Sequence, residues 1–256
     1  MKFSCRHRGW IDKIFWVSLN LEVIEPLQNF VICLWQMQSI TEQKTSVSNI
    51  IVADGCIDLI VLFDEKMIGY GGMDKSNLNQ AIQLPVNAMG ARLKPGAFEQ
   101  LTKISAKKVM DAFIPLETID ADFDSDYLFS LEFAQAKAYF VDYLMHLVGD
   151  KIPNRFVNLF DELSNHPPLA ANELYQKFNF SPRQCQRFFM RHFGISPQKV
   201  LLTLRLQYCM NTLLLGNASP NDILAHTGFY DQSHFINDFK RNIGLTPLAY
   251  LQMIRK

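Results

Sequence analysis

The stretch FKRNIGLTP, residues 239–247, repeats a pattern that the chain has already used fifty residues earlier. Residues 189–197 read FMRHFGISP, with phenylalanine, arginine, glycine and proline at the same positions as in the later copy. Isoleucine and serine of the first copy are replaced by the near-isosteres leucine and threonine in the second. A match in register without a gap predicts a duplicated structural unit, and the surrounding residues indicate what that unit is.

Each copy is predicted to contain a short helix, a tight turn and a second helix. The turns fall at Asn179 and Gly228, and both residue types accept the left-handed backbone that a sharp turn between helices requires. Ser181 and Asp231 follow at matched positions, where their side-chain oxygens can cap the second helices. The sequence therefore predicts two helix-turn-helix units.

The second helix of each unit is predicted to have an apolar face and a polar face. In a major groove arginine pairs with guanine, glutamine and asparagine pair with adenine, and an apolar side chain contacts the methyl group of thymine. The polar faces offer these base-reading candidates: Arg183, Gln186 and Arg187 in the first unit, and Gln232, Ser233, Ile236 and Asn237 in the second. The basic residues assigned to phosphates, which set affinity rather than sequence preference, are Arg191, Lys199, Lys240 and Arg241. A solvated helix surface is the alternative interpretation, but two polar faces in register, each behind a helix and a turn, favour helix-turn-helix geometry.

The segment between the units, residues 197–215, is predicted to be one helix, which Gly216 ends. A helix of that length spans about 28 Å at 1.5 Å per residue, and one turn of B-DNA is roughly 34 Å. The units, over residues 169–194 and 220–244, could therefore occupy successive major grooves on one side of a duplex. A single chain would then do what the two subunits of a dimeric repressor do.

The charges of the chain are unevenly distributed. The formal net charge is zero, but residues 167–256 hold ten Lys or Arg against four Asp or Glu, while residues 1–166 hold fifteen against twenty-one. A basic C-terminal third predicts a polyanionic partner for that part alone, and double-stranded DNA is such a partner.

The N-terminal half has a different pattern. Residues 27–93 contain short β-branched and aromatic runs separated by Gly, Asp and Asn, which predicts strands. A short helix is expected with Pro95 at its first position, and residues 127–148 predict one long helix that is apolar on most sides. Such a helix is buried by its own domain or by a second copy of the chain, so a homodimer stays open. The fold class is α+β, with a β-rich domain over 1–126, a helix and linker over 127–152, and an all-α domain over 153–256.

The C-terminal region resembles the DNA-binding domain of AraC/XylS-type transcription regulators. The matching run is GFYDQSHFINDFKRNIGLTPLAY (228–250), preceded by SPRQCQRFF (181–189) and RLQYCMNTLL (205–214). This resemblance implies two helix-turn-helix units joined by a long helix. It implies that the first unit reads one groove, and it places four residues of the second near the next groove: Gln232, Ser233, His234 and Asn237. The chain departs from the family where small residues are usual, at Tyr175, Cys209 and Leu224.

Residues 1 to about 120 more weakly resemble an uncharacterised domain that is often attached to such DNA-binding domains. The likeness rests on ADGCIDLIV (53–61) and GARLKPGAFEQL (90–101). It implies a regulatory domain, often a cupin-like β-barrel, that binds a small effector or mediates dimerisation.

The sequence contains only incomplete motifs for metal binding or catalysis. The carboxylates of residues 120–126 alternate as in a calcium loop, but the glycine and the final glutamate of that loop are missing. Asp54, Cys56 and Asp58 alternate along a predicted strand without a histidine near them. We therefore expect no metal, no cofactor and no enzyme. The rival hypothesis is an enzyme or a cysteine-based sensor with accessory DNA binding, in which Cys56 or Cys185 is the reactive thiol.

The chain is expected to be cytoplasmic and associated with the bacterial nucleoid. No apolar run reaches the roughly 18 residues of a membrane span. The five cysteines are odd in number and scattered, which fits a reducing compartment better than a disulfide framework. The identity of the effector and a contact with RNA polymerase stay open.

Overall fold

The computed structural model describes residues 17–40, 42–51, 55–71, 78–163, 166–215, 223–224 and 227–254. Asp54, Gly216 and most of residues 220–227, where the first helix of the second unit is expected, lie outside these residues. Within the described part, no helix is long and apolar enough to cross a bilayer.

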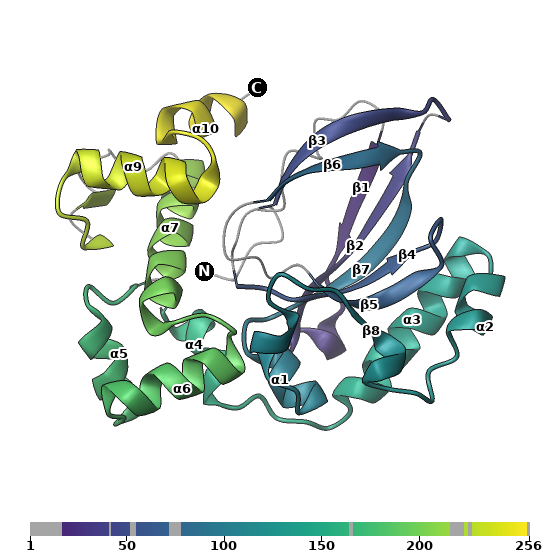
Figure 1. The fold of residues 1–256 in the computed structure, drawn as a ribbon, viewed down its shortest axis with the longest axis horizontal. Coiled ribbons are helices and arrows are strands. Elements are labelled where there is room, and N and C mark those ends of the chain that lie inside the picture. Colours follow the sequence, from purple (N-terminus) through teal and green to yellow (C-terminus); the bar gives the residue numbers. More distant parts are fainter. Residues whose placement is uncertain are drawn as a thin grey trace.

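The N-terminal part is built on two antiparallel sheets. The larger sheet has six strands in the order β1 (Val17–Glu22), β2 (Val31–Ser39), β7 (Asn87–Leu93), β4 (Asp58–Leu62), β5 (Met67–Gly71) and β8 (Ile114–Pro115). The smaller sheet pairs β3 (Thr45–Ile51) with β6 (Leu78–Leu84). Figure 1 shows this two-stranded ribbon above the larger sheet, with the helices of the N-terminal part below it.

The larger sheet is covered on both faces. On one face, Tyr70 and Leu59 pack in the same cluster as Phe98 and Phe140, which come from helices. These helices are α1 (Ala97–Thr102), α2 (Ser125–Ser130) and α3 (Phe133–Val148). On the other face, Trp35 packs in a separate cluster with residues of β6 and β7. The central strands are therefore mostly apolar along their length, without a strict alternation of apolar and polar residues.

Two expectations about the helices of this part are wrong. Helix α1 begins at Ala97 and not at Pro95, because Gly96 has φ 86° and lies before the helix in a left-handed conformation. A Cβ atom at Gly96 would lie 3.1 Å from backbone atoms of Phe156, so the close packing of this turn against a later helix also requires glycine. The single helix expected at 127–148 is two helices, because the backbone at Leu131 is extended.

Every regular element of the C-terminal part, among the residues that the structure describes, is a helix, as the sequence predicts. Its helices are α4 (Arg155–Leu163), α5 (Ala171–Phe178), α6 (Pro182–His192), α7 (Pro197–Leu215), α9 (Gln232–Ile243) and α10 (Pro247–Ile254). Figure 1 shows α7 as a central column, with α5 and α6 at one end and α9 and α10 at the other. The predicted α+β class, with a β-rich part followed by an all-α part, is confirmed.

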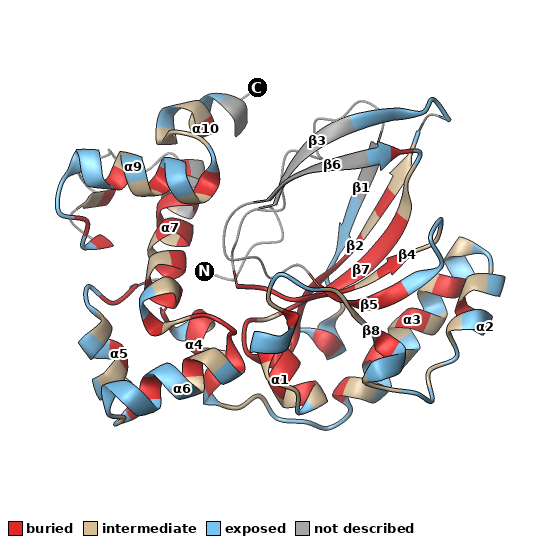
Figure 2. Cartoon of the chain, in the orientation of Figure 1, coloured by how far each residue is buried: buried red, intermediate tan, exposed pale blue. Residues whose placement is uncertain are grey.

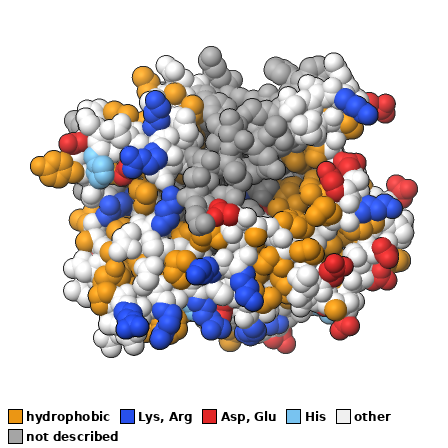
Figure 3. Space-filling model, in the orientation of Figure 1, with side chains coloured by type: hydrophobic (Ala, Val, Ile, Leu, Met, Phe, Trp, Pro, Cys, Tyr) orange, Lys and Arg blue, Asp and Glu red, His pale blue; other side chains and the backbone are white. Residues whose placement is uncertain are grey.

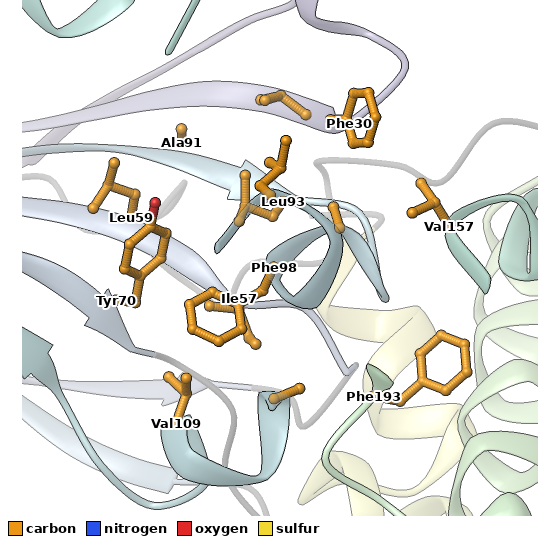
Figure 4. Packing of buried hydrophobic residues seen from close by; sticks show 14 of the residues in the cluster. Phe30, Ile57, Leu59, Tyr70, Ala91, Leu93, Phe98, Val109, Val157 and Phe193 are labelled. Atoms are coloured by element: carbon orange, nitrogen blue, oxygen red, sulfur yellow. The ribbon is translucent and has the colours of Figure 1, made fainter. Parts of the chain in front are cut away.

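The hydrophobic core does not divide where the sheets end. One continuous cluster runs from Phe30 and Tyr70 in the sheet region to Phe189 and Phe193 in the first helical unit. Figure 4 shows Val157 of α4 and Phe193, which follows α6, in the same packing as the sheet residues. A separate cluster serves the second unit, and its members are Leu206, Cys209, Met210, Leu213, Ile223, Phe229, Phe235, Phe239, Ile243 and Tyr250. The first unit thus shares a core with the sheet region, whereas the second unit has its own.

Candidate nucleic-acid interface

The first unit has a tight turn and a strongly capped helix. Helix α5 ends at Asn179, whose backbone is left-handed with φ 52°. Ser181 then caps α6: its hydroxyl accepts a hydrogen bond from the backbone N–H of Gln184. The Gln184 side chain accepts in return from the backbone N–H of Ser181 at 2.9 Å, which completes a capping box. The chain leaves α6 at Gly194, which has φ 70°.

The second unit repeats this chemistry where it is described. Gly228 has φ 65° and forms the turn. Asp231 caps α9, since its carboxylate accepts a hydrogen bond from the backbone N–H of His234 at 2.7 Å. Helix α9 ends at Gly244, with φ 85°. Both helices therefore start at the predicted caps, and each is followed by the glycine of the repeat in a left-handed conformation.

The two helices bury matched apolar faces. Cys185, Phe189 and His192 of α6 are buried, as are Phe235, Phe239 and Ile243 of α9. This pattern fixes the rotation of each helix about its own axis, so the opposite face must point outward. Figure 2 shows both a buried and an exposed side on each of the two helices.

The base-reading candidates lie on these outward faces. The exposed ones are Arg183, Gln186 and Arg187 of α6, and Gln232, Ser233, His234 and Asn237 of α9. Ile236 is half-buried and packs at the edge of the core of the second unit. The imidazole of His234 also makes contacts within its own unit, because Nε2 lies 3.2 Å from a carboxylate oxygen of Asp238 and Nδ1 lies 3.3 Å from the backbone nitrogen of Tyr230.

The four residues assigned to phosphates differ in their surroundings. Lys240 and Arg241 are exposed, and an Asp238 oxygen lies 3.7 Å from Arg241. The ammonium group of Lys199 donates to the side-chain oxygen of Asn242 at 2.7 Å, and burial lowers the pKa of this lysine. Arg191 is already paired within the protein, as described next.

A buried carboxylate joins the N-terminal part to α6. Glu99 of α1 is 6% exposed. One of its oxygens accepts from Nε of Arg191 at 2.7 Å, and the other lies 2.8 Å from Nδ1 of His192. The ring of His192 stacks on Phe156 of α4, with ring centroids 3.8 Å apart. Sequence analysis missed this site, because Glu99 and Arg191 are ninety-two residues apart and no local pattern marks either as a partner.

The described residues offer little support for thiol or metal chemistry. No group of three His, Cys, Asp or Glu side chains among them could hold a metal ion. Burial raises the pKa of the Cys185 thiol to about 11, which keeps it protonated near neutral pH and disfavours it as a nucleophile. Cys56 is also buried. Cys33 is disulfide-bonded.

A buried polar cluster lies in the larger sheet. Asp58 of β4 accepts from the indole N–H of Trp35 at 3.1 Å and pairs with Arg92 of β7 at 3.4 Å. Both charged side chains are less than a tenth exposed. Buried charges are retained when they are paired. Asp58 therefore has a structural partner and needs no metal to explain its burial.

Comparison with known proteins identifies the two parts. Residues 174–253 match the family model described as a helix-turn-helix domain, and residues 24–115 match a domain of unknown function, DUF6597. The C-terminal part is an AraC-type helix-turn-helix domain. This AraC-type domain contains the whole of α6, α7 and α9 with their caps and outward faces. The resemblance stated from the sequence is thereby confirmed.

Curated relatives match through this AraC-type domain. The chain is 33% identical over 102 residues to the HTH-type transcriptional activator RhaS of Yersinia pestis bv. Antiqua (strain Angola), which covers 39% of this chain and 37% of the relative. It is 29% identical over 122 residues to the virulence regulon transcriptional activator VirF of Yersinia enterocolitica, which covers 48% and 44%. The chain thus spans less than half the length of the curated relatives it matches.

Solved structures are similar at low TM-scores. The C-terminal domain of the two-component response regulator yesN from Fusobacterium nucleatum subsp. nucleatum is 28% identical, with 37% of this chain and 91% of that chain covered and a TM-score of 0.33. ToxT from Vibrio cholerae O395 is 10% identical, with 93% and 96% covered and a TM-score of 0.40. At these scores the likeness carries no argument about this chain.

Proposed function

We propose that this protein is a sequence-specific DNA-binding transcription regulator. The observation that carries the proposal is the pair of matched units: α6 and α9 have equivalent caps, equivalent buried faces and exposed polar faces, and they lie at opposite ends of α7. Relatives of the AraC-type domain are named transcriptional activators, which supports the same function.

In this proposal each unit enters a major groove. Arg183, Gln186 and Arg187 read the first groove, and their exposure on α6 leaves them available to base edges. The residues proposed for the second groove are Gln232, Ser233, His234, Ile236 and Asn237. The phosphate contacts proposed earlier, Arg191, Lys199, Lys240 and Arg241, position the units without reading sequence.

The N-terminal part is proposed to regulate DNA binding. Its sheets share a core with the first helix-turn-helix unit, so a change in the N-terminal part could be transmitted to α6. A small-molecule effector, a second copy of the chain and RNA polymerase are its proposed partners. A protein with this function would be located in the cytoplasm, where the DNA is. An enzyme based on Cys185 is disfavoured, because that thiol is buried and its pKa is raised.

Selection of binding sites from a genomic DNA library tests this function with the purified full-length chain. Two units on one side of a duplex predict an enriched motif with two half-sites about 10 base pairs apart. Recovery of fragments with no common motif would contradict sequence-specific binding. Screening of small molecules for a change in affinity on the selected site would then identify an effector.

A further inference from the structure

We propose that the N-terminal part itself contributes to the DNA interface, through Lys107 and Lys108, which contact the phosphate backbone beside the first unit. This inference rests on the proposed function, because it extends the surface of α6 that is proposed to enter a groove. It assigns a DNA contact to a segment outside the AraC-type domain.

The lysines lie on a short 3-10 helix, η4 (Ala106–Val109), that is fixed by its apolar residues. Ala106 and Val109 are both fully buried. Lys107 and Lys108 stand between them and are exposed. A helix anchored at both ends in the core has little freedom to turn, so the two ammonium groups are held at the surface.

The 3-10 helix η4 is docked against the end of α6. The hydroxyl of Ser105, immediately before η4, donates to the backbone oxygen of Arg191 at 3.4 Å. The preceding helix α1 holds the same turn of α6 through Glu99, which pairs with Arg191 and lies against His192. These polar contacts connect α1 and the start of η4 to the last turn of α6.

This position suits a phosphate contact rather than a base contact. The base-reading candidates occupy the first half of α6, from Arg183 to Arg187, and Arg191 follows on the same side one turn later. When the first half of such a helix lies in a major groove, the region beyond its end meets the backbone that borders the groove. Lys107 and Lys108 are placed in that region by the contact between η4 and Arg191.

Most of the exposed charged side chains along this edge are basic, with Lys103, Lys107 and Lys108 against Asp111. Neither Lys107 nor Lys108 forms an ion pair with any of the described residues. Glu99, the acidic residue nearest α6, is buried and neutralised by Arg191. Figure 3 shows Lys and Arg side chains gathered along the lower edge of the molecule, where Figure 1 places α6 and α1. A basic edge continuous with the proposed groove-binding helix is complementary to DNA phosphates.

The test is the salt dependence of binding by the full-length double variant Lys107→Ala/Lys108→Ala. Affinity for the selected site and for random DNA is measured by fluorescence anisotropy across a salt series. We expect the slope of log K against log salt to become shallower by about one to two units, since each lost phosphate contact removes about 0.9. Affinity should fall on both DNAs by a similar factor, and Lys107→Glu/Lys108→Glu should lower it further.

A matched control removes two charges from the other end of the N-terminal part. Lys44 precedes β3 and Lys66 lies in the β4–β5 turn, and both are exposed. The opposite end of the β4–β5 hairpin lies toward the C-terminal helices, since Gly55 approaches Phe160 and Ile195. We expect Lys44→Ala/Lys66→Asn to leave the slope unchanged. Asparagine is used at Lys66 because the backbone there is left-handed, with φ 49°.

Two outcomes would overturn this inference. Equal slopes for the Lys107/Lys108 variant and the control would show that η4 does not reach DNA. Tighter binding by the Lys107/Lys108 variant would show that this segment obstructs DNA. Failure of the proposed function looks different, because the wild-type chain itself would then show no preference for any sequence.

Discussion

At the scale of single residues, Arg187 tests whether α6 reads bases. Its side chain is exposed. Its guanidinium carbon lies 5.3 Å from the ring centroid of the neighbouring Phe188, and this cation–π contact involves no acidic side chain. We expect Arg187→Ala to weaken binding to the selected site by about 1–3 kcal/mol and to relax one base preference. Competition assays with a substituted-site library measure both effects. An equal loss on selected and random DNA would count against base reading.

Lys240 and Lys199 are both proposed to contact phosphates, but only Lys240 is exposed. Lys240 is exposed on α9, whereas the ammonium group of Lys199 is half-buried and bonded to Asn242. We expect Lys240→Ala to lower the slope of log K against log salt by about one unit. Lys199→Ala should change that slope less. An unchanged slope for Lys240→Ala would show that this lysine touches no phosphate.

At the scale of elements, the two turns adopt the same backbone with different residues. Asn179 and Gly228 are both left-handed, but a Cβ atom at Gly228 would lie 3.2 Å from the Arg205 side chain and 3.3 Å from the Leu169 carbonyl oxygen. We expect Gly228→Ala to lower the free energy of unfolding by about 1–2 kcal/mol. Asn179→Gly, in the first unit, should be nearly neutral. Urea unfolding compares the two variants, and equal stability of Gly228→Ala and wild type would contradict the strain argument.

The sequence predicts the ends of helices well where a nearby side chain determines them. The caps at Ser181 and Asp231 are confirmed because a cap needs only a side-chain oxygen and a neighbouring N–H. The break at Leu131 was missed because leucine is a good helix former, so nothing local ends the helix. The pairing of Glu99 with Arg191 could not be predicted either, because it depends on how two distant segments pack.

At the scale of the whole molecule, the contact around Glu99 makes stability depend on pH through His192. Burial lowers the pKa of His192. The negative charge of Glu99 on α1 raises this pKa, whereas the positive charges of Arg191 on α6 and Arg155 on α4 lower it further. The unfolded chain takes up this proton near pH 6.5, but the folded chain takes it up only at lower pH. The stabilisation is therefore complete above about pH 6.5 and is lost as the pH falls through the folded pKa.

Thermal unfolding between pH 8 and pH 5 measures this effect. We expect the midpoint of His192→Gln to fall less on acidification than that of the wild type. His146→Gln, which changes an exposed histidine on α3, should follow the wild-type curve. Identical pH dependence in all three proteins would exclude His192 as a source of acid sensitivity.

The sharing of one core between the sheets and the first unit gives the two units different genetic consequences. Phe193 packs in the core that the first unit shares with the sheet region, so we expect a damaging substitution there to lower the amount of folded protein in a cell. Phe239 packs in the separate core of the second unit, so we expect the same kind of damage there to leave the sheet region and the first unit folded. Under the proposed function, alleles of the first kind would abolish DNA binding, whereas alleles of the second kind would keep the DNA contacts of the first unit alone.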